Sequence, residues 1–379
     1  MKKTAVVVGL ILLACSVIGP AWAEEEEENK GKIRYDKGVK FDSADGKFRF
    51  KINNRVQVRY TQVNPDEGES IGSFRLRRFK FKMSGHVFTH WKYKLQLNFA
   101  GQGDDVADVE NGQVVLEQDD VLEDAWFQYT KHNWIQPWVG QGKTKFSRER
   151  LNSSGKLLFV DRALISDEAE VPRDTGVALV GYDKKRRFEY NVGVYNGNAL
   201  NQKTNDNGEF AYAGRAVWTP FGEYKLAEGA LDYPDSPKLA VGIDGYRNTL
   251  TDETGTDLDI IIYGPEIAFK VKGFYAQAEY YRIDLDVAGG GAGEIDTGYL
   301  QASYLLPGRR IEFAGRISTT DPDSVAESVS NEEFDTSIGF NYYFKGHDFK
   351  VQADLTNVDD RSTSDNDSLD FRAQIQFAF

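Results

Sequence analysis

Hydrophobic and polar residues alternate one by one along most of the chain after residue 46. From Lys47 onward, aromatic and aliphatic side chains occupy every second position, with Arg, Lys, Asn or Gln between them. A period of two places successive side chains on opposite faces of a β-strand, whereas a helix has a period of 3.6. The pattern therefore predicts strands, each with one apolar and one polar face.

Sixteen such segments follow one another to the C-terminus. They lie at 47–63, 72–86, 90–100, 119–131, 134–143, 174–182, 187–195, 208–219, 238–247, 259–271, 273–285, 295–306, 309–318, 333–344, 348–358 and 368–379. The last one alternates up to the terminal Phe379, and an aromatic C-terminal residue resembles the assembly signal of bacterial outer-membrane barrels.

The connections between these segments alternate in length. Lys270–Gly273, Leu306–Arg309 and Phe344–His347 are tight turns. The connections between them are longer and acidic, at 101–118, 144–173, 196–207, 248–258, 286–294, 319–332 and 359–367. Short turns on one rim and long loops on the other are the plan of an outer-membrane barrel, and an even strand count places both termini in the periplasm. One link on the short side, 220–237, is long and departs from this rule.

We therefore predict an all-β fold in which residues 47–379 form a transmembrane antiparallel β-barrel of 16 strands. The alternative is a soluble β-sandwich, whose apolar faces would meet in a shared core. The strand count, the alternating loop lengths and the aromatic terminus favour the barrel.

The N-terminus has the pattern of a secretory signal peptide over residues 1–23. Lys2 and Lys3 precede an apolar stretch at 5–18, and Ala21-Trp22-Ala23 fits a cleavage site. Residues 24–46 would then form an acidic, mobile periplasmic lead-in, and the protein would be exported through the periplasm to the outer membrane of a Gram-negative bacterium. The alternative is lipoprotein processing at Cys15, the only cysteine of the chain. If cleavage follows Ala23, thiol chemistry and disulfides are excluded.

Charge is distributed unevenly along the chain. The whole chain carries −13, yet residues 31–100 hold 16 Lys or Arg against 6 Asp or Glu. A basic segment within an acidic protein indicates a local anion site, and the net charge argues against nucleic-acid binding.

The polar strand faces would line the pore if the apolar faces contact lipid. The early strands then present Arg49, Lys51, Arg55, Arg59, Arg78, Lys80, Lys82, Lys92 and Lys94, and later strands add Arg215, Arg316, Lys350 and Arg372. Such a lumen would concentrate anions and exclude cations. Alternatively, these cations pair with Glu189, Glu266, Glu279, Glu312 and Asp354 on other strands, which would leave a general diffusion porin with little ion selectivity.

The longest loop, 144–173, combines basic residues with hydroxyl groups, as a partly dehydrated oxyanion requires. Because large porins commonly fold one loop into the lumen, we predict that this loop forms the constriction. A solvated surface loop is the alternative.

Patterns for catalysis or metal binding are weak. Gly142-Lys143-Thr144 resembles the end of a P-loop, but Pro137 stands where the first glycine is required. The four histidines lack metal-ligand spacing, and a G-x-S-x-G elbow is absent from the sequence. We expect neither enzymatic activity nor a cofactor or metal. A plugged adhesin or structural barrel remains a third possibility, which measurable conductance would exclude.

The order of several short motifs resembles the phosphate-selective porin O and P family over essentially the whole mature chain. These motifs are Arg75-x-Arg77-Arg78, Trp91-Lys92-Tyr93-Lys94-Leu95, Glu123-Asp124-Ala125-Trp126, Gly140-Gln141-x-Lys143-x-x-Phe146-Ser147-x-Glu149, Ser153-Ser154, Phe159-x-Asp161-Arg162-Ala163-Leu164, Arg173-Asp174-x-Gly176-Val177, Asn196-Gly197 and Thr219-Pro220.

The resemblance implies a homotrimeric anion porin in outer-membrane lipid, with an arginine ladder that leads to a lysine-rich constriction and with phosphate or a similar small inorganic anion as its solute. Asp124 would orient the cations. The implied anion-binding residues are Arg55, Arg59, Arg77 or Arg78, Lys92, Lys94, Arg150, Ser153 and Ser154. The chain departs from the family at Lys145, where proline is usual, and at Arg150, which is basic but not lysine.

Overall fold

The computed structural model describes residues 31–379 except 101–107, 111–112, 116–120, 203, 253, 329 and 363–366. The predicted signal peptide, including Cys15, and the acidic residues 24–30 lie outside the described residues, as does most of the predicted loop 101–118.

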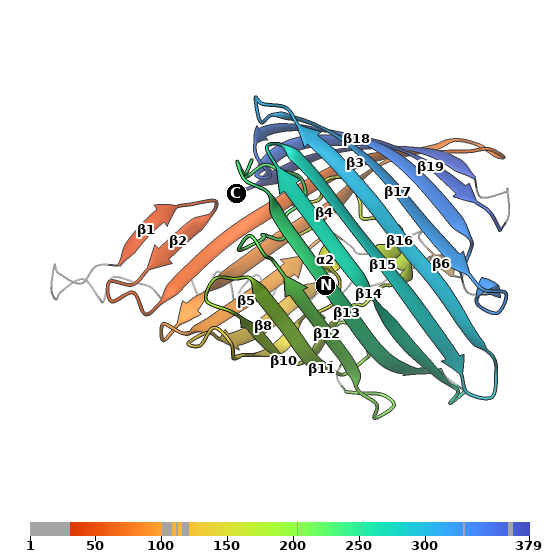
Figure 1. The fold of residues 1–379 in the computed structure, drawn as a ribbon, viewed down its shortest axis with the longest axis horizontal. Helices are drawn as coiled ribbons and strands as arrows, with labels where there is room; N and C mark the ends of the chain where they lie inside the picture. The colour runs from red at the N-terminus through yellow and green to blue at the C-terminus, as the bar shows by residue number, and fades with distance from the viewer. Residues whose placement is uncertain are drawn as a thin grey trace.

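Sixteen strands form a closed antiparallel barrel, as predicted (Figure 1). Consecutive strands pair with each other, and the last strand pairs with the first to close the cylinder. The strands are β3 (Arg49–Pro65), β4 (Ile71–Val87), β5 (Trp91–Asn98), β8 (Leu122–Tyr129), β9 (Gln136–Lys143), β10 (Arg173–Tyr182), β11 (Phe188–Tyr195), β12 (Ala211–Trp218), β13 (Lys238–Thr251), β14 (Asp257–Val271), β15 (Phe274–Val287), β16 (Ala292–Leu305), β17 (Ile311–Pro322), β18 (Glu333–Lys345), β19 (Phe349–Asp360) and β20 (Ser368–Ala378).

The two rims differ in the lengths of their connections. On the short-turn rim, only two residues separate β14 from β15 and three separate β18 from β19. The opposite, long-loop rim carries the small hairpin of β6 (Asp108–Glu110) and β7 (Gln113–Val115), and the 3-10 turn η1 (Ala326–Ser328). This asymmetry agrees with the sequence prediction.

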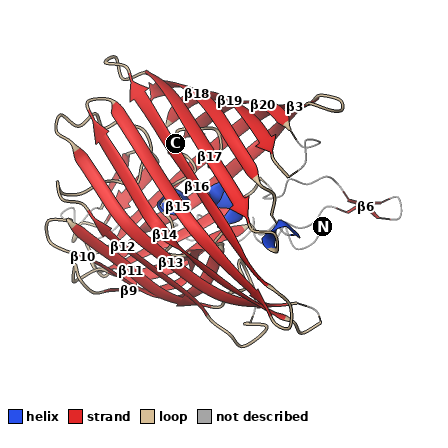
Figure 2. Ribbon diagram, turned by 45° about the vertical axis from the view of Figure 1, so that its right-hand side comes forward, coloured by secondary structure: helices blue, strands red, loops and turns tan. Residues whose placement is uncertain are grey.

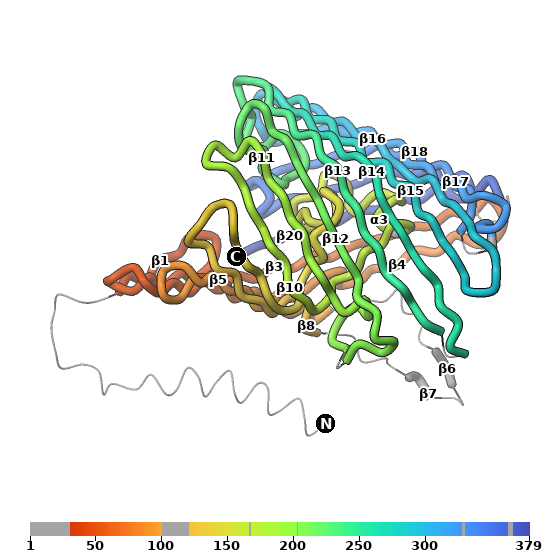
Figure 3. Tube along the Cα trace, turned by 60° about the horizontal axis from the view of Figure 1, so that its bottom comes forward, coloured from red at the N-terminus to blue at the C-terminus, as the bar shows by residue number. Residues whose placement is uncertain are grey.

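Part of the predicted lead-in is structured, so the prediction of a mobile segment was wrong for residues 32–42. β1 (Lys32–Tyr35) and β2 (Val39–Asp42) form a hairpin, and β2 pairs with the first residues of β3. It does so on the edge of β3 that β20 occupies farther along the strand. The hairpin projects from the end of the barrel where the C-terminus lies (Figure 3).

Two β-bulges interrupt the alternation in the basic half of the wall. Gln57 pairs with Arg78 while Val58 pairs with Leu76, so Arg77 is an extra residue in β4. In β8, Glu123 is extra in the same way, because Gln96 pairs with Asp124 and Leu97 with Leu122. A bulge of this kind re-aims side chains. Each of the two bulges brings two consecutive charged residues to the inner side of the barrel.

The segment between β9 and β10, here called the inward loop (144–172), folds into the barrel, as predicted. It contains two short helices, α2 (Arg148–Leu151) and α3 (Ile165–Glu168), which lie within the barrel (Figure 2). Among the described residues, no helix is long and apolar enough to cross a membrane.

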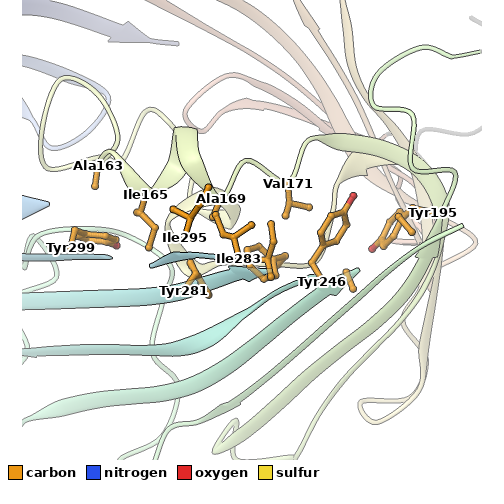
Figure 4. Packing of buried hydrophobic residues seen from close by; sticks show 14 of the residues in the cluster. Ala163, Ile165, Ala169, Val171, Tyr195, Tyr246, Tyr281, Ile283, Ile295 and Tyr299 are labelled. Atoms are coloured by element: carbon orange, nitrogen blue, oxygen red, sulfur yellow. The ribbon is translucent and has the colours of Figure 1, made fainter. Parts of the chain in front are cut away.

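Apolar side chains of the inward loop pack against the wall formed by the middle strands. Ala163, Ile165 and Val171 of the loop join Tyr281 and Tyr299 of the wall in one buried cluster (Figure 4). A second cluster contains Leu158 and Phe159 of the loop with Tyr275. These contacts hold the loop against one side of the lumen.

The link between β12 and β13, residues 219–237, is long although it lies on the short-turn rim. Its length lets it reach the inward loop inside the barrel. The Glu228 carboxylate accepts hydrogen bonds from Leu158 N (2.7 Å) and Asn152 Nδ2 (3.1 Å) of the inward loop. Ala230 is fully buried in the same cluster as Leu158. The link and the loop together fill the side of the lumen next to β13–β17.

Candidate functional site

A cavity of about 790 Å³ lies in the lumen on the side of β3, β4 and β5. Twelve basic residues line it: Arg55, Arg59, Arg75, Arg77, Arg78, Lys80, Lys94, Lys143, Arg150, Arg162, Arg173 and Arg372. Four carboxylates line it, those of Glu123, Asp161, Glu170 and Asp370. The excess of cations gives the cavity a positive potential, which low-dielectric walls focus onto any ion inside it.

Three arginines converge on one carboxylate at the centre of this cavity. Asp161 of the inward loop accepts a hydrogen bond from Arg59 and lies 3.6 Å from Arg77 Nη2 and 3.7 Å from Arg78 Nη2. Burial alone would raise the pKa of Asp161, but these guanidinium groups hold it well below its usual range. Asp161 therefore remains ionised, and the arginines are already arranged around an oxyanion.

Arg55 lies across the tip of the inward loop. It donates to Ser153 Oγ (3.0 Å) and Ser154 Oγ (2.8 Å). The approach depends on Gly155, because a Cβ there would come within 2.2 Å of Arg55 Nη1. Both hydroxyls also line the cavity, so the arginine and the serines form one polar surface.

The second bulge supplies counter-charges to the lysines. Lys94 donates to Asp124 (2.9 Å), and Lys80 donates to Glu123. Arg173 lies within 3.7 Å of Glu123 and 3.6 Å of Asp124. These carboxylates are almost fully buried, so they fix the positions of the cations and leave the exposed surface basic. Asp124 thus contacts two cations of the cavity wall, Lys94 and Arg173.

Nine of the ten predicted site residues come together in or beside this cavity. Lys92 does not, because it lies exposed near the start of β5 and pairs with His86, close to the short-turn rim. Alternation correctly placed Lys92 on the inner face, but it carries no information about height along the barrel axis.

Arg77 and Arg78 both face the cavity, although strict alternation allows only one of them. Sequence reasoning also omitted several lining residues from the site, because their partners lie far away in the chain. These are Glu123, Lys143, Asp161, Arg162 and Arg173.

Most cations of the later strands are buried against polar partners, in agreement with the alternative interpretation, whereas Arg372 has a partner and still lines the cavity. Arg215 donates to both oxygens of Glu266 (2.9 and 2.6 Å), and Arg372 donates to Asp354 (3.0 Å). Lys350 is fully buried and donates to the Leu157 carbonyl of the inward loop (2.9 Å). Lys350 therefore helps to hold the loop, and neither Lys350 nor Arg215 lines the cavity.

The two departures from the family pattern have different positions. Lys145 is not among the residues that line the cavity, and its ammonium group lies over the Trp138 ring, 4.7 Å from the centroid. Arg150 lines the cavity and forms an ion pair with Glu170 at 2.6 Å. Only the departure at Arg150 therefore changes the surface that a solute meets.

In the part of the chain that the structure describes, no three His, Cys, Asp or Glu side chains are grouped so that they could hold a metal ion.

Solved structures share this fold at low sequence identity. The chain resembles the anion-selective porin from Comamonas acidovorans with a TM-score of 0.61 and 11% identity, over 87% of this chain and 99% of that one. It also resembles the DcaP channel of Acinetobacter baumannii, with a TM-score of 0.58 and 12% identity over 89% and 99%. OmpF of Salmonella typhi gives a TM-score of 0.58 at 11% identity over 92% and 100%.

Sequence comparison extends the match to nearly the full length. An uncharacterized protein of Aquifex aeolicus (strain VF5) is 22% identical, over 88% of this chain and 87% of its own length. The model of the phosphate-selective porin O and P family matches residues 50–379. Together with the closed barrel, this match identifies an outer-membrane channel: the chain belongs to the phosphate-selective porin O and P family.

Proposed function

We propose that this porin is a passive, anion-selective channel for phosphate or a related small oxyanion. The observation that carries the proposal is the lining of the cavity, where twelve cations face four carboxylates in an otherwise acidic protein. Arginine suits oxyanions because its planar donor fork can bind two oxygens at once. The Asp161 carboxylate already accepts a hydrogen bond from Arg59 and lies within 3.7 Å of Arg77 and Arg78.

Anion selectivity requires that solutes travel close to the basic residues on the inner faces of β3, β4 and β5. The loop and the link fill the side of the lumen next to β13–β17, where acidic residues such as Glu279 and Asp244 are buried. A solute is therefore confined to the side of β3, β4 and β5. Its path runs between Arg59 and Arg78 on the wall and Arg150 and Ser153 on the loop.

We also propose that the chain is exported through the periplasm of a Gram-negative bacterium and forms a homotrimer in the outer membrane. The trimer is supported by the family and by the fold shared with OmpT of Vibrio cholerae, solved in a trimer form (TM-score 0.57, 10% identity, 87% of this chain and 99% of that one). In this orientation the short-turn rim faces the periplasm.

The experiment is a planar-bilayer measurement of reversal potential across a KCl gradient, followed by addition of phosphate. An anion channel gives a reversal potential near the chloride limit, and millimolar phosphate blocks the chloride current. Arg78→Gln should weaken the block about tenfold, as expected for loss of one charge-assisted hydrogen bond. Arg247→Gln, on the exposed outer end of β13, is the matched control.

Equal passage of potassium and chloride, with no effect of phosphate, would show a general diffusion porin. In that case the lumen cations would be neutralised wall charges.

A further inference from the structure

The turn between β10 and β11, residues 183–187, carries four consecutive basic residues at the short-turn rim. Its sequence is Asp183-Lys184-Lys185-Arg186-Arg187. Lys184, Lys185 and Arg187 are exposed. None of these residues lines the cavity beside the inward loop, so the passage of solutes through the lumen does not account for them.

The carboxylate of the turn itself holds the backbone of the turn. Asp183 Oδ1 accepts hydrogen bonds from Arg187 N (2.5 Å) and Phe188 N (3.1 Å). These contacts fix the shape of the turn and use the carboxylate as an acceptor for backbone donors.

Two further carboxylates nearby are paired with Arg186. The guanidinium lies 3.5 Å from Glu189 and 3.6 Å from Glu223. In the part of the chain that the structure describes, the ammonium groups of Lys184 and Lys185 have neither an ion-pair nor a hydrogen-bond partner. The tip of the turn therefore presents positive charge that the protein does not neutralise.

Exposed aromatic side chains surround the base of this turn on the outer wall. Phe188 and Trp218, partners in the β11–β12 ladder, are 40% and 55% exposed. Trp134, in the turn between β8 and β9, lies 6.3 Å from the Phe188 ring and 6.2 Å from the Tyr190 ring. Such aromatic girdles mark the level of the lipid headgroups on a transmembrane barrel. The basic turn therefore begins where the hydrocarbon of the bilayer ends.

An apolar groove of about 630 Å³ lies on the outer wall next to this girdle. It crosses β9 to β12, and its lining includes Pro137, Val177, Leu179 and Val192. Val177 and Val192 are 55% and 50% exposed on this face. Leu179 is only four residues from the start of the basic turn at Asp183. Hydrocarbon fills a groove at this position, because the core of a bilayer holds no water.

We propose that this surface binds an anionic phospholipid of the periplasmic leaflet. Lys184 and Lys185 contact the headgroup phosphate, and an acyl chain lies in the groove. The site is on the outside of the barrel and goes beyond the proposed channel function, with which it shares only the orientation of the short-turn rim toward the periplasm.

Charge and continuity both favour this occupant. Two unpaired ammonium groups complement an anionic headgroup, whereas a zwitterionic headgroup adds a cation beside them. The groove and the girdle continue the lipid-facing wall, so a lipid covers the whole surface at once. A free phosphate ion would leave the groove and the girdle without a contact.

Native mass spectrometry of the detergent-solubilised oligomer tests the site by counting bound lipids. The probes are phosphatidylglycerol and phosphatidylcholine with identical acyl chains, titrated separately. Lys184→Gln/Lys185→Gln removes both charges, and Lys184→Arg/Lys185→Arg keeps them. Arg247→Gln/Arg361→Gln is the matched control, because it removes two charges from exposed positions on the long-loop rim.

We expect the unmodified protein to bind phosphatidylglycerol more tightly than phosphatidylcholine. Each cation near an anionic lipid surface is worth about fivefold in affinity, so Lys184→Gln/Lys185→Gln should weaken phosphatidylglycerol binding about 25-fold. Binding of phosphatidylcholine should stay unchanged in this variant. The arginine double variant and the control should resemble the natural protein with both lipids.

Equal binding of the two lipids by the unmodified protein, or an equal loss in the control, overturns the site. Displacement of phosphatidylglycerol by millimolar inorganic phosphate at constant ionic strength would show that the turn binds the free ion. Lipid binding by separated protomers but not by the oligomer would show that this face lies between two copies of the chain. Either result also overturns the proposal.

The channel function is measured separately in the planar bilayer. Chloride preference and phosphate block should be unchanged in Lys184→Gln/Lys185→Gln, because neither lysine lines the cavity. Failure of the lipid site and failure of the anion channel are therefore distinguishable.

Discussion

At the residue scale, the basic wall depends on side chains that strict alternation would place outside. Arg77 and Arg78 are neighbours in the chain, yet both reach Asp161 because the bulge in β4 turns them to the same side. The same device brings Glu123 and Asp124 to the lysines and Arg173. Local charge density in the cavity thus exceeds what two regular strands can provide.

The bulge can be tested by cysteine scanning, because the only natural cysteine is Cys15, within the predicted signal peptide. Cysteines that replace Arg77 and Arg78 should both react with a water-soluble thiosulfonate, while Leu76→Cys and Phe79→Cys should stay unreactive in the lipid-facing wall. Regular alternation predicts reaction at 76 and not at 77. Mass spectrometry of labelled protein in detergent-free liposomes distinguishes the two patterns.

Both bulges can be recognised in the sequence from a change in the parity of the apolar positions. Apolar residues occupy even positions at Phe74 and Leu76 but odd positions from Phe79 onward. The parity changes in the same way between Leu122 and Ala125. Such a change in parity requires one extra residue in the strand. The alternation gives no such sign for the contact of Asp161, since its partnership with Arg59 joins residues 102 positions apart.

Glu149 gives the inward loop a dependence on pH. Burial, with Glu228 and Glu279 nearby, raises the pKa of Glu149 from about 4.5 to about 8. The folded protein therefore holds a proton that the unfolded chain releases between these pH values. This contribution to stability is complete below pH 4.5 and is lost as the pH rises through 8.

We expect the free energy of unfolding to fall by about 1 kcal/mol per pH unit between pH 5 and pH 8 through this group. Denaturant titration at several pH values measures the slope, and Glu149→Gln should flatten it. An equal slope in the variant would assign the dependence to other groups.

At the scale of elements, wall carboxylates cap the N-terminus of α2 and so position the inward loop. Glu279 of β15 accepts hydrogen bonds from Arg148 N (3.0 Å), Glu149 N (2.8 Å) and Ser147 Oγ (2.8 Å). Asp244 of β13 accepts one from Ser147 N (3.0 Å), and Asp354 of β19 accepts one from Val160 N (2.7 Å). Free N–H groups at a helix start require acceptors, and here the barrel supplies them.

Glu279→Ala should release the loop, because it leaves several buried donors without an acceptor. We expect a loss of about 3–5 kcal/mol in loop docking, together with larger and noisier single-channel conductance and weaker anion preference. Glu294→Ala removes an exposed carboxylate that pairs with Arg282, and it should change conductance little. Conductance unchanged in Glu279→Ala would mean that the apolar contacts alone hold the loop.

The strands were predictable because a half-exposed wall forces a period of two along its whole length. The inward direction of loop 144–172 was predicted from its length and composition, but its anchors were not, since each of them joins distant segments. The hairpin β1–β2 was missed because its two short strands, of four residues each, lie outside the lipid-facing pattern.

At the scale of the whole molecule, the barrel separates a filled half from an open half. Acidic and aromatic residues of β13–β17 contact the inward loop and hold it in place, whereas the basic residues of β3–β5 face the open cavity. The net charge of −13 therefore does not describe the field that a solute experiences. Long-range attraction comes from the cavity charges, and direct binding comes from a few donors at short range.

These two contributions should respond differently to salt. The Debye length falls from about 10 Å at 0.1 M to about 3 Å at 1 M. We expect the chloride preference, measured as the reversal potential at a fixed KCl ratio, to decrease over this range. The affinity for phosphate, which depends on direct contacts, should decrease less when KCl is replaced by a salt that does not compete for the site. Parallel loss of both would mean that no oxyanion site exists.

The seam at which the barrel closes runs through the basic wall. β20 pairs with β3 along the cavity, and Gln376 accepts a hydrogen bond from Gln57 (2.6 Å) across a sequence separation of 319 residues. During biogenesis the first strands therefore carry their arginines before the neighbouring strand β20, which completes the wall beside them, has been made. Because the last strand completes both the cylinder and the wall, a chain that stalls before its final hairpin cannot form a selective leak. Closure and selectivity are acquired in the same step of assembly.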